Sequence, residues 1–245
     1  MLATRWATVD ALGAAFAVHG PSVCAVCHGW GRGRVCGACL GRFAAAVPRC
    51  SRCALPLSAP TPVCGTCLAA APPFDAALAA VDYRAPWDRL VTAFKFHDAL
   101  DLARPFAGAI AAAERARAAP RPSLLLPVPL APTRLRTRGY NQAWEIARRL
   151  ARALGIAAEP ALLLRLRETV HQLALPPLAR AGNVTGAFAI EPRRRSEIAG
   201  REVAVVDDVM TTGSTAAELA RVLKQAGAKR VEVWVLARTP RPEDA

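Results

Sequence analysis

From Arg121 onward, short apolar runs alternate with stretches in which apolar residues recur at helical spacing. A buried strand followed by an amphipathic helix gives this pattern, and its repetition predicts beta-alpha-beta units on a parallel sheet. The predicted strands are residues 124–128, 162–166, 203–206 and 231–236. We therefore expect an α/β fold with a Rossmann-like parallel sheet.

Helices are expected between the predicted strands of this region and also before it. Apolar residues recur between Trp144 and Leu154, where Gly155 is a stop signal, and again between Leu219 and Ala226, before Gly227. Earlier in the chain, residues 74–83 predict a strand. Two helices should follow it, with a core face formed by Trp87, Leu90, Val91, Phe94, Phe96, Leu102, Phe106 and Ile110.

All eight cysteines lie in four Cys-x-x-Cys pairs, a spacing that presents two thiolates to one metal ion. We favour adjacent pairing, although alternate pairs can also interleave. The resulting sites are Cys24, Cys27, Cys36 and Cys39, and Cys50, Cys53, Cys64 and Cys67. Two structural zinc ions are expected in a double zinc ribbon. A disulfide framework is the alternative, but it needs an oxidising compartment and usually a secretion signal.

The predicted organisation has four parts. Residues 1–20 form an amphipathic helix, 21–70 the zinc ribbon, 71–120 a strand and helices that pack on the core domain, and 121–240 the sheet domain. The apolar stretch near the N-terminus is at the short limit for a signal peptide, and no later stretch reaches the length of a membrane span. We expect a cytoplasmic protein.

The net charge of +13 favours polyanionic partners through long-range attraction, either nucleic acid or a phosphorylated small molecule. The alternative is an arginine-biased composition without such a partner, because only Lys95, Lys224 and Lys229 are lysines. The charge alone leaves both open.

A candidate ligand site follows the predicted strand 203–206. The paired acids Asp207 and Asp208 suit the two hydroxyls of a ribose ring. The loop and helix start after them offer backbone N–H groups and hydroxyls to a phosphate. These residues are Thr211, Thr212, Gly213, Ser214 and Thr215. An acidic turn that caps a helix through Asp208 or Thr212 is the simpler alternative.

Arginines near the first predicted strand complete this candidate site. Arg134 and Arg138 follow the proline turn at Pro127 and Pro129, and they can bind pyrophosphate through charge-assisted hydrogen bonds. Arg180 lies in the long connection 169–188, which is long enough to close over a bound ligand.

These motifs together resemble the ComF/GntX family, in which a cysteine-rich ribbon precedes a type I phosphoribosyltransferase domain. The resemblance spans most of the chain. It is carried by the cysteine pairs, the Asp207-Asp208 motif and two further stretches, 127–142 and 169–188. His171 and Ala181-Gly182 depart from the usual family pattern in the second stretch.

The resemblance implies a phosphoribosyltransferase, a pentosyl-transferring glycosyltransferase of nucleotide metabolism. It implies phosphoribosyl pyrophosphate and Mg²⁺ as ligands, with Asp207 and Asp208 catalytic. It also implies a link to DNA uptake in natural competence and transformation, with single-stranded DNA and competence proteins such as a DNA helicase as partners. The alternative is a non-catalytic DNA-handling or partner-binding adaptor that retains a ligand-sensing nucleotide site.

Overall fold

The computed structural model describes residues 21–58, 61–167 and 184–240. The chain divides into two compact units, one ending at Ala45 and the other beginning at Ala46. The helix expected at 1–20 and the Arg180 part of the long connection lie outside the described residues. Within the described ranges, no helix is both long and apolar enough to cross a membrane.

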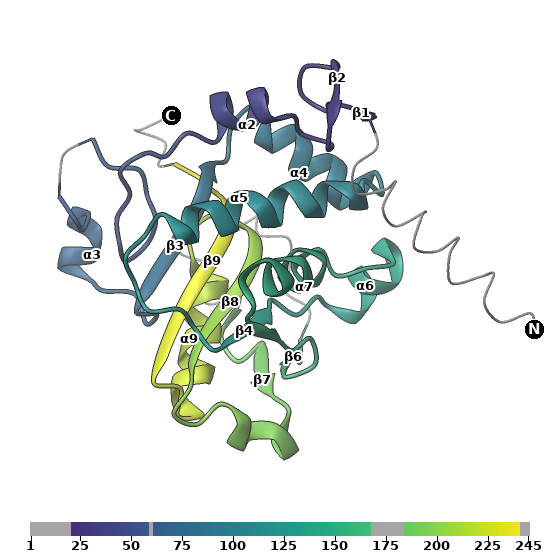
Figure 1. Ribbon diagram of the computed structural model, residues 1–245. Coiled ribbons are helices and arrows are strands. Elements are labelled where there is room, and N and C mark those ends of the chain that lie inside the picture. Colours follow the sequence, from purple (N-terminus) through teal and green to yellow (C-terminus); the bar gives the residue numbers. More distant parts are fainter. Residues whose placement is uncertain (1–20, 59–60, 168–183, 241–245) are drawn as a thin grey trace, which may run out of the picture. The chain divides into compact units, whose positions relative to one another are not determined.

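The N-terminal unit consists of a small hairpin and a short helix (Figure 1). Its elements are β1 (Pro21–Val23), β2 (Trp30–Arg32) and α2 (Gly37–Phe43). The β1 and β2 strands pair antiparallel, and the backbone N–H of Cys24 donates to the carbonyl of Gly29 at 2.9 Å. Among its described residues, Val35 is the one buried apolar side chain besides cysteines, so the cysteines have to organise this part of the unit.

The second unit is built on a five-stranded, fully parallel sheet with the order β3-β9-β8-β4-β5 (Figure 1). These strands are β3 (Ala76–Asp82), β4 (Leu124–Pro127), β5 (Ala157–Ala158), β8 (Glu202–Met210) and β9 (Arg230–Arg238). The central strand β8 lies between β4 and β9, so the loops after β4 and β8 leave the same edge of the sheet.

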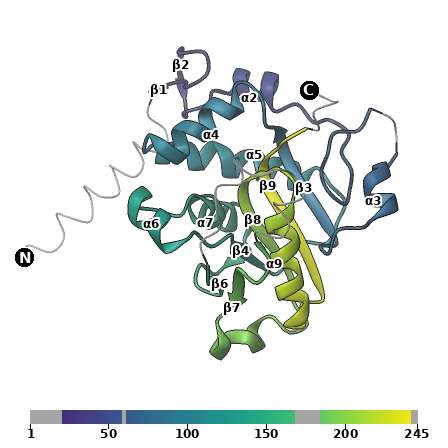
Figure 2. The same ribbon diagram turned by 180° about the vertical axis from the view of Figure 1, so that it is seen from behind.

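Helices cover both faces of the sheet, as Figures 1 and 2 show from opposite sides. Helices α5 and α7 contact one face, and α9 packs with strand β7 on the other. The helices and remaining strands of this unit are α3 (Gly65–Ala69), α4 (Trp87–Phe96), η1 (Leu100–Leu102), α5 (Ala103–Arg115), α6 (Pro132–Arg138), α7 (Gln142–Leu154), β6 (Leu163–Arg165), β7 (Phe188–Ile190), η3 (Pro192–Glu197) and α9 (Ser214–Gln225).

Most predicted elements of the sheet domain are confirmed. Helix α7 ends at Gly155, whose φ of 68° is the left-handed conformation that glycine adopts at low cost. At the start of α7, the Asn141 side chain accepts hydrogen bonds from the N–H groups of Ala143 and Trp144 and donates to the carbonyl of Val128 at 3.0 Å. This residue therefore fixes the helix to the loop that follows β4.

Two predictions about local structure were wrong, and one helix was not predicted. The run 162–166 is a strand, but β6 pairs antiparallel with β7 outside the parallel sheet. The edge position is taken by β5, which follows Gly155 almost at once, and an apolar run by itself does not specify its partner. The arginine-rich turn contains an unpredicted helix, α6, which has Pro132 at its start and Gly139 at its end. Phe96, expected in the core, is 64% exposed.

Candidate functional site

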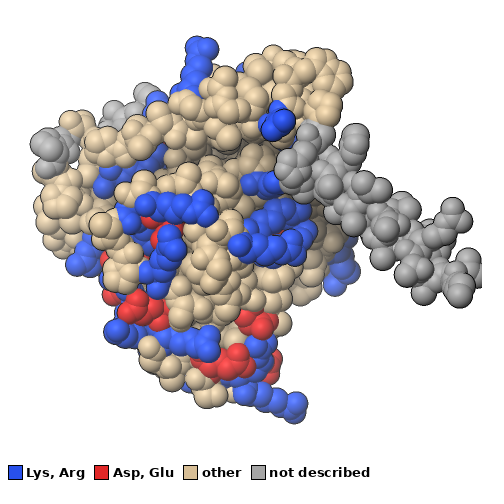
Figure 3. Space-filling view, viewed as in Figure 1, with Lys and Arg blue, Asp and Glu red and all other residues tan. Residues whose placement is uncertain are grey.

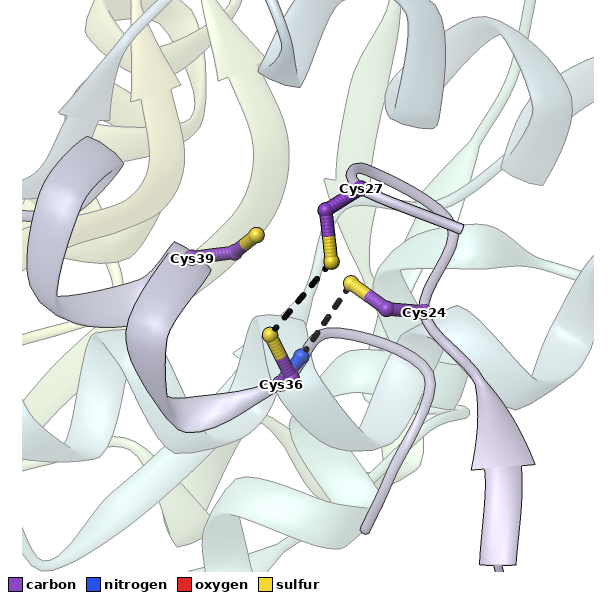
Figure 4. A group of neighbouring side chains, drawn as sticks. All are labelled: Cys24, Cys27, Cys36 and Cys39. Atoms are coloured by element: carbon purple, nitrogen blue, oxygen red, sulfur yellow. Dashed lines mark hydrogen bonds between the residues drawn. The ribbon is translucent and has the colours of Figure 1, made fainter. Parts of the chain in front are cut away.

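The first cysteine cluster lies entirely within the N-terminal unit. The sulfur atoms of Cys24, Cys27, Cys36 and Cys39 point toward one another and lie within 4.8 Å (Figure 4). The turn after β1 supplies the first pair, and the start of α2 supplies the second. The N–H groups of Val26 and Cys36 both donate to Cys24 Sγ, at 3.4 Å each. Burial alone would raise the pKa of Cys24, but hydrogen bonds from the backbone N–H groups of Cys27, Cys36 and Val26 lower it to about 6.

The second cluster lies in the second unit and is more deeply buried. Its four residues, Cys50, Cys53, Cys64 and Cys67, are each at most 9% exposed. They form a small core with Leu55, and Cys64 donates its N–H to Cys50 Sγ at 3.3 Å. The adjacent pairing of the cysteines is therefore confirmed for both sites.

Both clusters fit a tetrahedral metal ion. A Zn–S bond of about 2.3 Å implies sulfur atoms about 3.8 Å apart in a tetrahedron. The distance from Cys27 Sγ to Cys36 Sγ is 3.8 Å, and that from Cys53 Sγ to Cys64 Sγ is 3.6 Å. A disulfide bond is about 2.05 Å long, and all eight cysteines are free thiols. The geometry favours metal ligation over the disulfide alternative.

The predicted phosphate loop connects β8 to α9 and borders a cavity of about 320 Å³. Gly213 has a φ of 81°, which turns the backbone into the helix. The residues Asp207, Asp208, Thr211, Gly213, Ser214, Thr215 and Arg134 all line this cavity. The cavity thus brings together the two carboxyl groups of β8, the hydroxyls of the following loop, the N-terminus of α9 and an arginine of α6 at one edge of the sheet.

Asp207 and Asp208 belong to strand β8 itself, which continues to Met210. Asp208 is only 2% exposed, and its Oδ2 lies 2.9 Å from Lys95 Nζ of helix α4. Burial and the neighbouring charge of Asp208 raise the pKa of Asp207 to about 8. Burial by itself would lower the pKa of Lys95, but the charges of Asp208 and Asp207 outweigh it and raise that pKa. The site therefore holds one ion pair beside a second carboxyl group that resists ionisation.

Two predicted ligand residues, Arg138 and Thr212, do not line this cavity. Arg138 donates to Gln142 Oε1 at 2.6 Å and lies over the Phe96 ring, while Gln142 lines the cavity. Thr212 borders a second cavity, and its hydroxyl contacts Ser214 Oγ at 2.8 Å and accepts from the Ser214 N–H at 3.4 Å. The Thr212 hydroxyl thus contacts the first residue of α9, but the N-cap of that helix is Gly213, without a side-chain cap, and Asp208 pairs with Lys95.

The sequence patterns missed three residues that line the cavity, Lys95, Tyr83 and Arg165. Lys95 interrupts the apolar spacing of α4 between Phe94 and Phe96. Its one distinguishing signal is that lysine is rare in a chain whose cations are nearly all arginine.

Lys95→Met is expected to lower the free energy of unfolding by about 3 kcal/mol, since the buried Asp208 carboxylate would lose its cation. Adding Asp208→Asn to that variant should recover most of the loss. The control is Lys229→Met, which removes an exposed partner of Glu202 and should cost less than about 1 kcal/mol. Urea unfolding measures all three. A loss from Lys95→Met no larger than that of the control would contradict the buried ion pair.

Comparison with known proteins assigns the fold to a class. Residues 138–245 match the phosphoribosyl transferase domain family. One solved structure with a similar fold is glutamine phosphoribosylpyrophosphate amidotransferase from B. subtilis, with 24% identity and a TM-score of 0.36 over 54% of this chain and 25% of that one. The family match places a phosphoribosyltransferase-type domain in the second unit.

Two relatives extend the similarity over most of the chain. DNA utilization protein YhgH of Salmonella typhi is 34% identical over 229 residues, which cover 89% of this chain and 98% of that protein. Competence protein F of Haemophilus influenzae is 34% identical over 195 residues, which cover 78% of this chain and 85% of that protein. The chain belongs to the ComF/GntX family.

Proposed function

We propose that this protein binds phosphoribosyl pyrophosphate with Mg²⁺ and transfers its phosphoribosyl group to a nucleophile. One observation supports this above all. The acid pair at the end of β8 and the loop Thr211, Gly213, Ser214 and Thr215 line a single cavity, at the edge of a parallel sheet where ligands of α/β folds bind.

Each part of the site has a role in binding this ligand. The loop N–H groups and hydroxyls hold the 5-phosphate, and the positive end of α9 adds to the attraction. The Asp208 carboxylate and the Asp207 carboxyl group accept hydrogen bonds from the ribose hydroxyls through their oxygens. Arg134 lies across the cavity, where it pairs with pyrophosphate, and Arg138 and Arg180 are proposed to assist.

The chemistry is a substitution at the anomeric carbon of ribose. The bond from this carbon to the pyrophosphate oxygen breaks, and its electron pair leaves with pyrophosphate as the nucleophile forms the new bond. Positive charge develops on the ribose, so the nearby carboxylates stabilise the transition state. Mg²⁺, bound with the substrate, would neutralise charge on the leaving pyrophosphate.

We further propose that zinc occupies both cysteine clusters and is structural. Four thiolates complete the tetrahedral coordination and leave no position for water or substrate. Free cysteines held for a metal are typical of a reducing compartment, in agreement with a cytoplasmic location.

The test begins with calorimetry on zinc-loaded protein with Mg²⁺ and phosphoribosyl pyrophosphate. A screen of nucleobases with labelled donor then identifies the acceptor by product formation. A variant that lacks both the Asp207 and Asp208 carboxylates is the matched negative control. The absence of phosphoribosyl pyrophosphate binding to the wild type would overturn the proposal.

A second candidate is a DNA-handling function linked to competence, which the names of the relatives and the basic surface favour. The face drawn in Figure 3 shows many more Lys and Arg than Asp and Glu side chains. Arg152 of α7 is exposed and adds to the basic character, whereas Arg148 and Arg149 pair with Glu145. Single-stranded DNA and competence proteins such as a DNA helicase are the proposed partners. Filter binding at several salt concentrations tests direct contact, and no binding at low salt excludes it.

A further inference from the structure

Arg238, the last residue of β9, is a buried cation that joins two parts of the second unit. It is 6% exposed. Its Nε donates to the carbonyl of Cys53 at 3.0 Å, and its Nη1 donates to the carbonyl of Met210 at 3.0 Å and to that of Thr211. One guanidinium therefore contacts both the second cysteine cluster and the start of the phosphate loop.

The contacts with Met210 and Thr211 orient the loop backbone. In a trans peptide group, the carbonyl and the following N–H point in opposite directions. Because both carbonyls face Arg238, the N–H groups of Thr211 and Thr212 are directed away from it. Nη1 also donates to the Thr239 carbonyl at 2.8 Å, which fixes the guanidinium itself. Arg238 thus helps to orient these loop amides, together with the Thr239 N–H, which donates to the Met210 carbonyl at 3.1 Å.

The contact with Cys53 connects this arrangement to the metal site. The Cys53 carbonyl belongs to the same residue as one of the four sulfur ligands. Its turn is closed by a hydrogen bond from the Ala54 N–H to the Cys50 carbonyl at 2.8 Å. A bound metal ion would fix both cysteines of the turn, and with them the acceptor for Arg238 Nε.

Ala54, next to Cys53, packs in the core of the second unit, but between it and the loop the described residues leave an open space. A cavity of about 850 Å³ lies between the ribbon and the loop, with Cys53, Cys67, Thr211, Ser214 and Arg238 among its lining residues. Because the described residues leave this cavity open, the polar contacts of Arg238 contribute to supporting the loop on that side.

We propose that Arg238 is a positioning residue through which metal bound at the second cysteine cluster holds the phosphate loop in its binding geometry. The ligand part of this inference rests on the proposed function. Metal loss from the second cluster should therefore loosen the loop and weaken phosphoribosyl pyrophosphate binding, although none of these cysteines lines the ligand cavity described above.

Cysteine variants of the full-length protein test the metal part. Cys53→Ser removes a ligand of the second cluster, and the matched control Cys27→Ser removes one from the first. Zinc content and amide hydrogen exchange of residues 209–215 are measured for both. Cys53→Ser should speed exchange in this segment at least tenfold relative to wild type, and Cys27→Ser should leave it unchanged. Equal exchange in the two variants would overturn the proposal.

Arg238→Lys tests the connection with the cysteines intact, which covers the case in which Cys53→Ser does not fold. Lysine keeps the charge but cannot donate in the same fork geometry. It should retain zinc, speed exchange in 209–215, and weaken phosphoribosyl pyrophosphate binding about tenfold. The control is Arg230→Lys at the opposite end of β9, where Nε pairs with Glu232.

The outcomes separate the two proposals. If the wild type does not bind phosphoribosyl pyrophosphate, the proposed function fails, and hydrogen exchange still decides the role of Arg238. If the wild type binds and Arg238→Lys matches Arg230→Lys in exchange and affinity, the positioning role is wrong.

Discussion

A double variant with Asp207→Asn and Asp208→Asn is expected to reduce phosphoribosyl transfer by roughly 10³-fold while the chain stays folded. Asparagine keeps the shape of both side chains but removes the negative charge of Asp208, and the charge that Asp207 gains when it ionises, both of which would stabilise positive charge on the ribose. It also removes the partner of Lys95, whose cation would then face the substrate unopposed. The loss should appear mainly in kcat, because the phosphate loop still binds the 5-phosphate.

The matched control for the acid pair is Glu202→Gln. Glu202 is the first residue of β8, so it lies at the other end of the same strand, where it pairs with Lys229 at 3.0 Å. This variant should keep wild-type transfer. Urea unfolding of both variants shows whether stability is affected. A folded double variant with transfer within threefold of wild type would remove the acid pair from the mechanism.

Removal of zinc is expected to unfold the second cysteine segment. Outside its metal site this segment has a small apolar core of Leu55, Leu57 and Val63 and the single short helix α3. A structural zinc ion contributes on the order of 10 kcal/mol to the folding of such a segment. We expect two zinc ions per chain by metal analysis. After chelation, limited proteolysis should cut within residues 46–70.

Zinc added back before the protease should restore protection, whereas Mg²⁺ should not, because Mg²⁺ prefers oxygen ligands. The sheet strands β8 and β9 are a suitable internal reference, since they pair along most of their length and should resist the same digestion. Zinc-free protein that resists cleavage in 46–70 as well as the zinc-bound form does would show that metal is not needed to fold this segment.

Local patterns in the sequence were sufficient to predict much of the fold and part of the candidate site. The Cys-x-x-Cys spacing predicted both clusters, because two ligands of one ion must lie within a few residues of each other in a tight turn. The run from β8 through Gly213 into α9 predicted the candidate phosphate loop, because its strand, loop and helix start are consecutive in the sequence. The apolar periodicity of α7 and its glycine stop were also sufficient.

The tertiary structure determined which residues from distant parts of the chain contact these motifs. Lys95 and Asp208 are far apart in the chain, and they meet because α4 passes the end of β8. Arg238 is similarly distant from Cys53. The strand 163–165 lies outside the parallel sheet, whose edge position next to β4 is occupied by β5. Spacing and periodicity describe neighbours along the chain, whereas such contacts depend on strand order and helix packing, which no local pattern specifies.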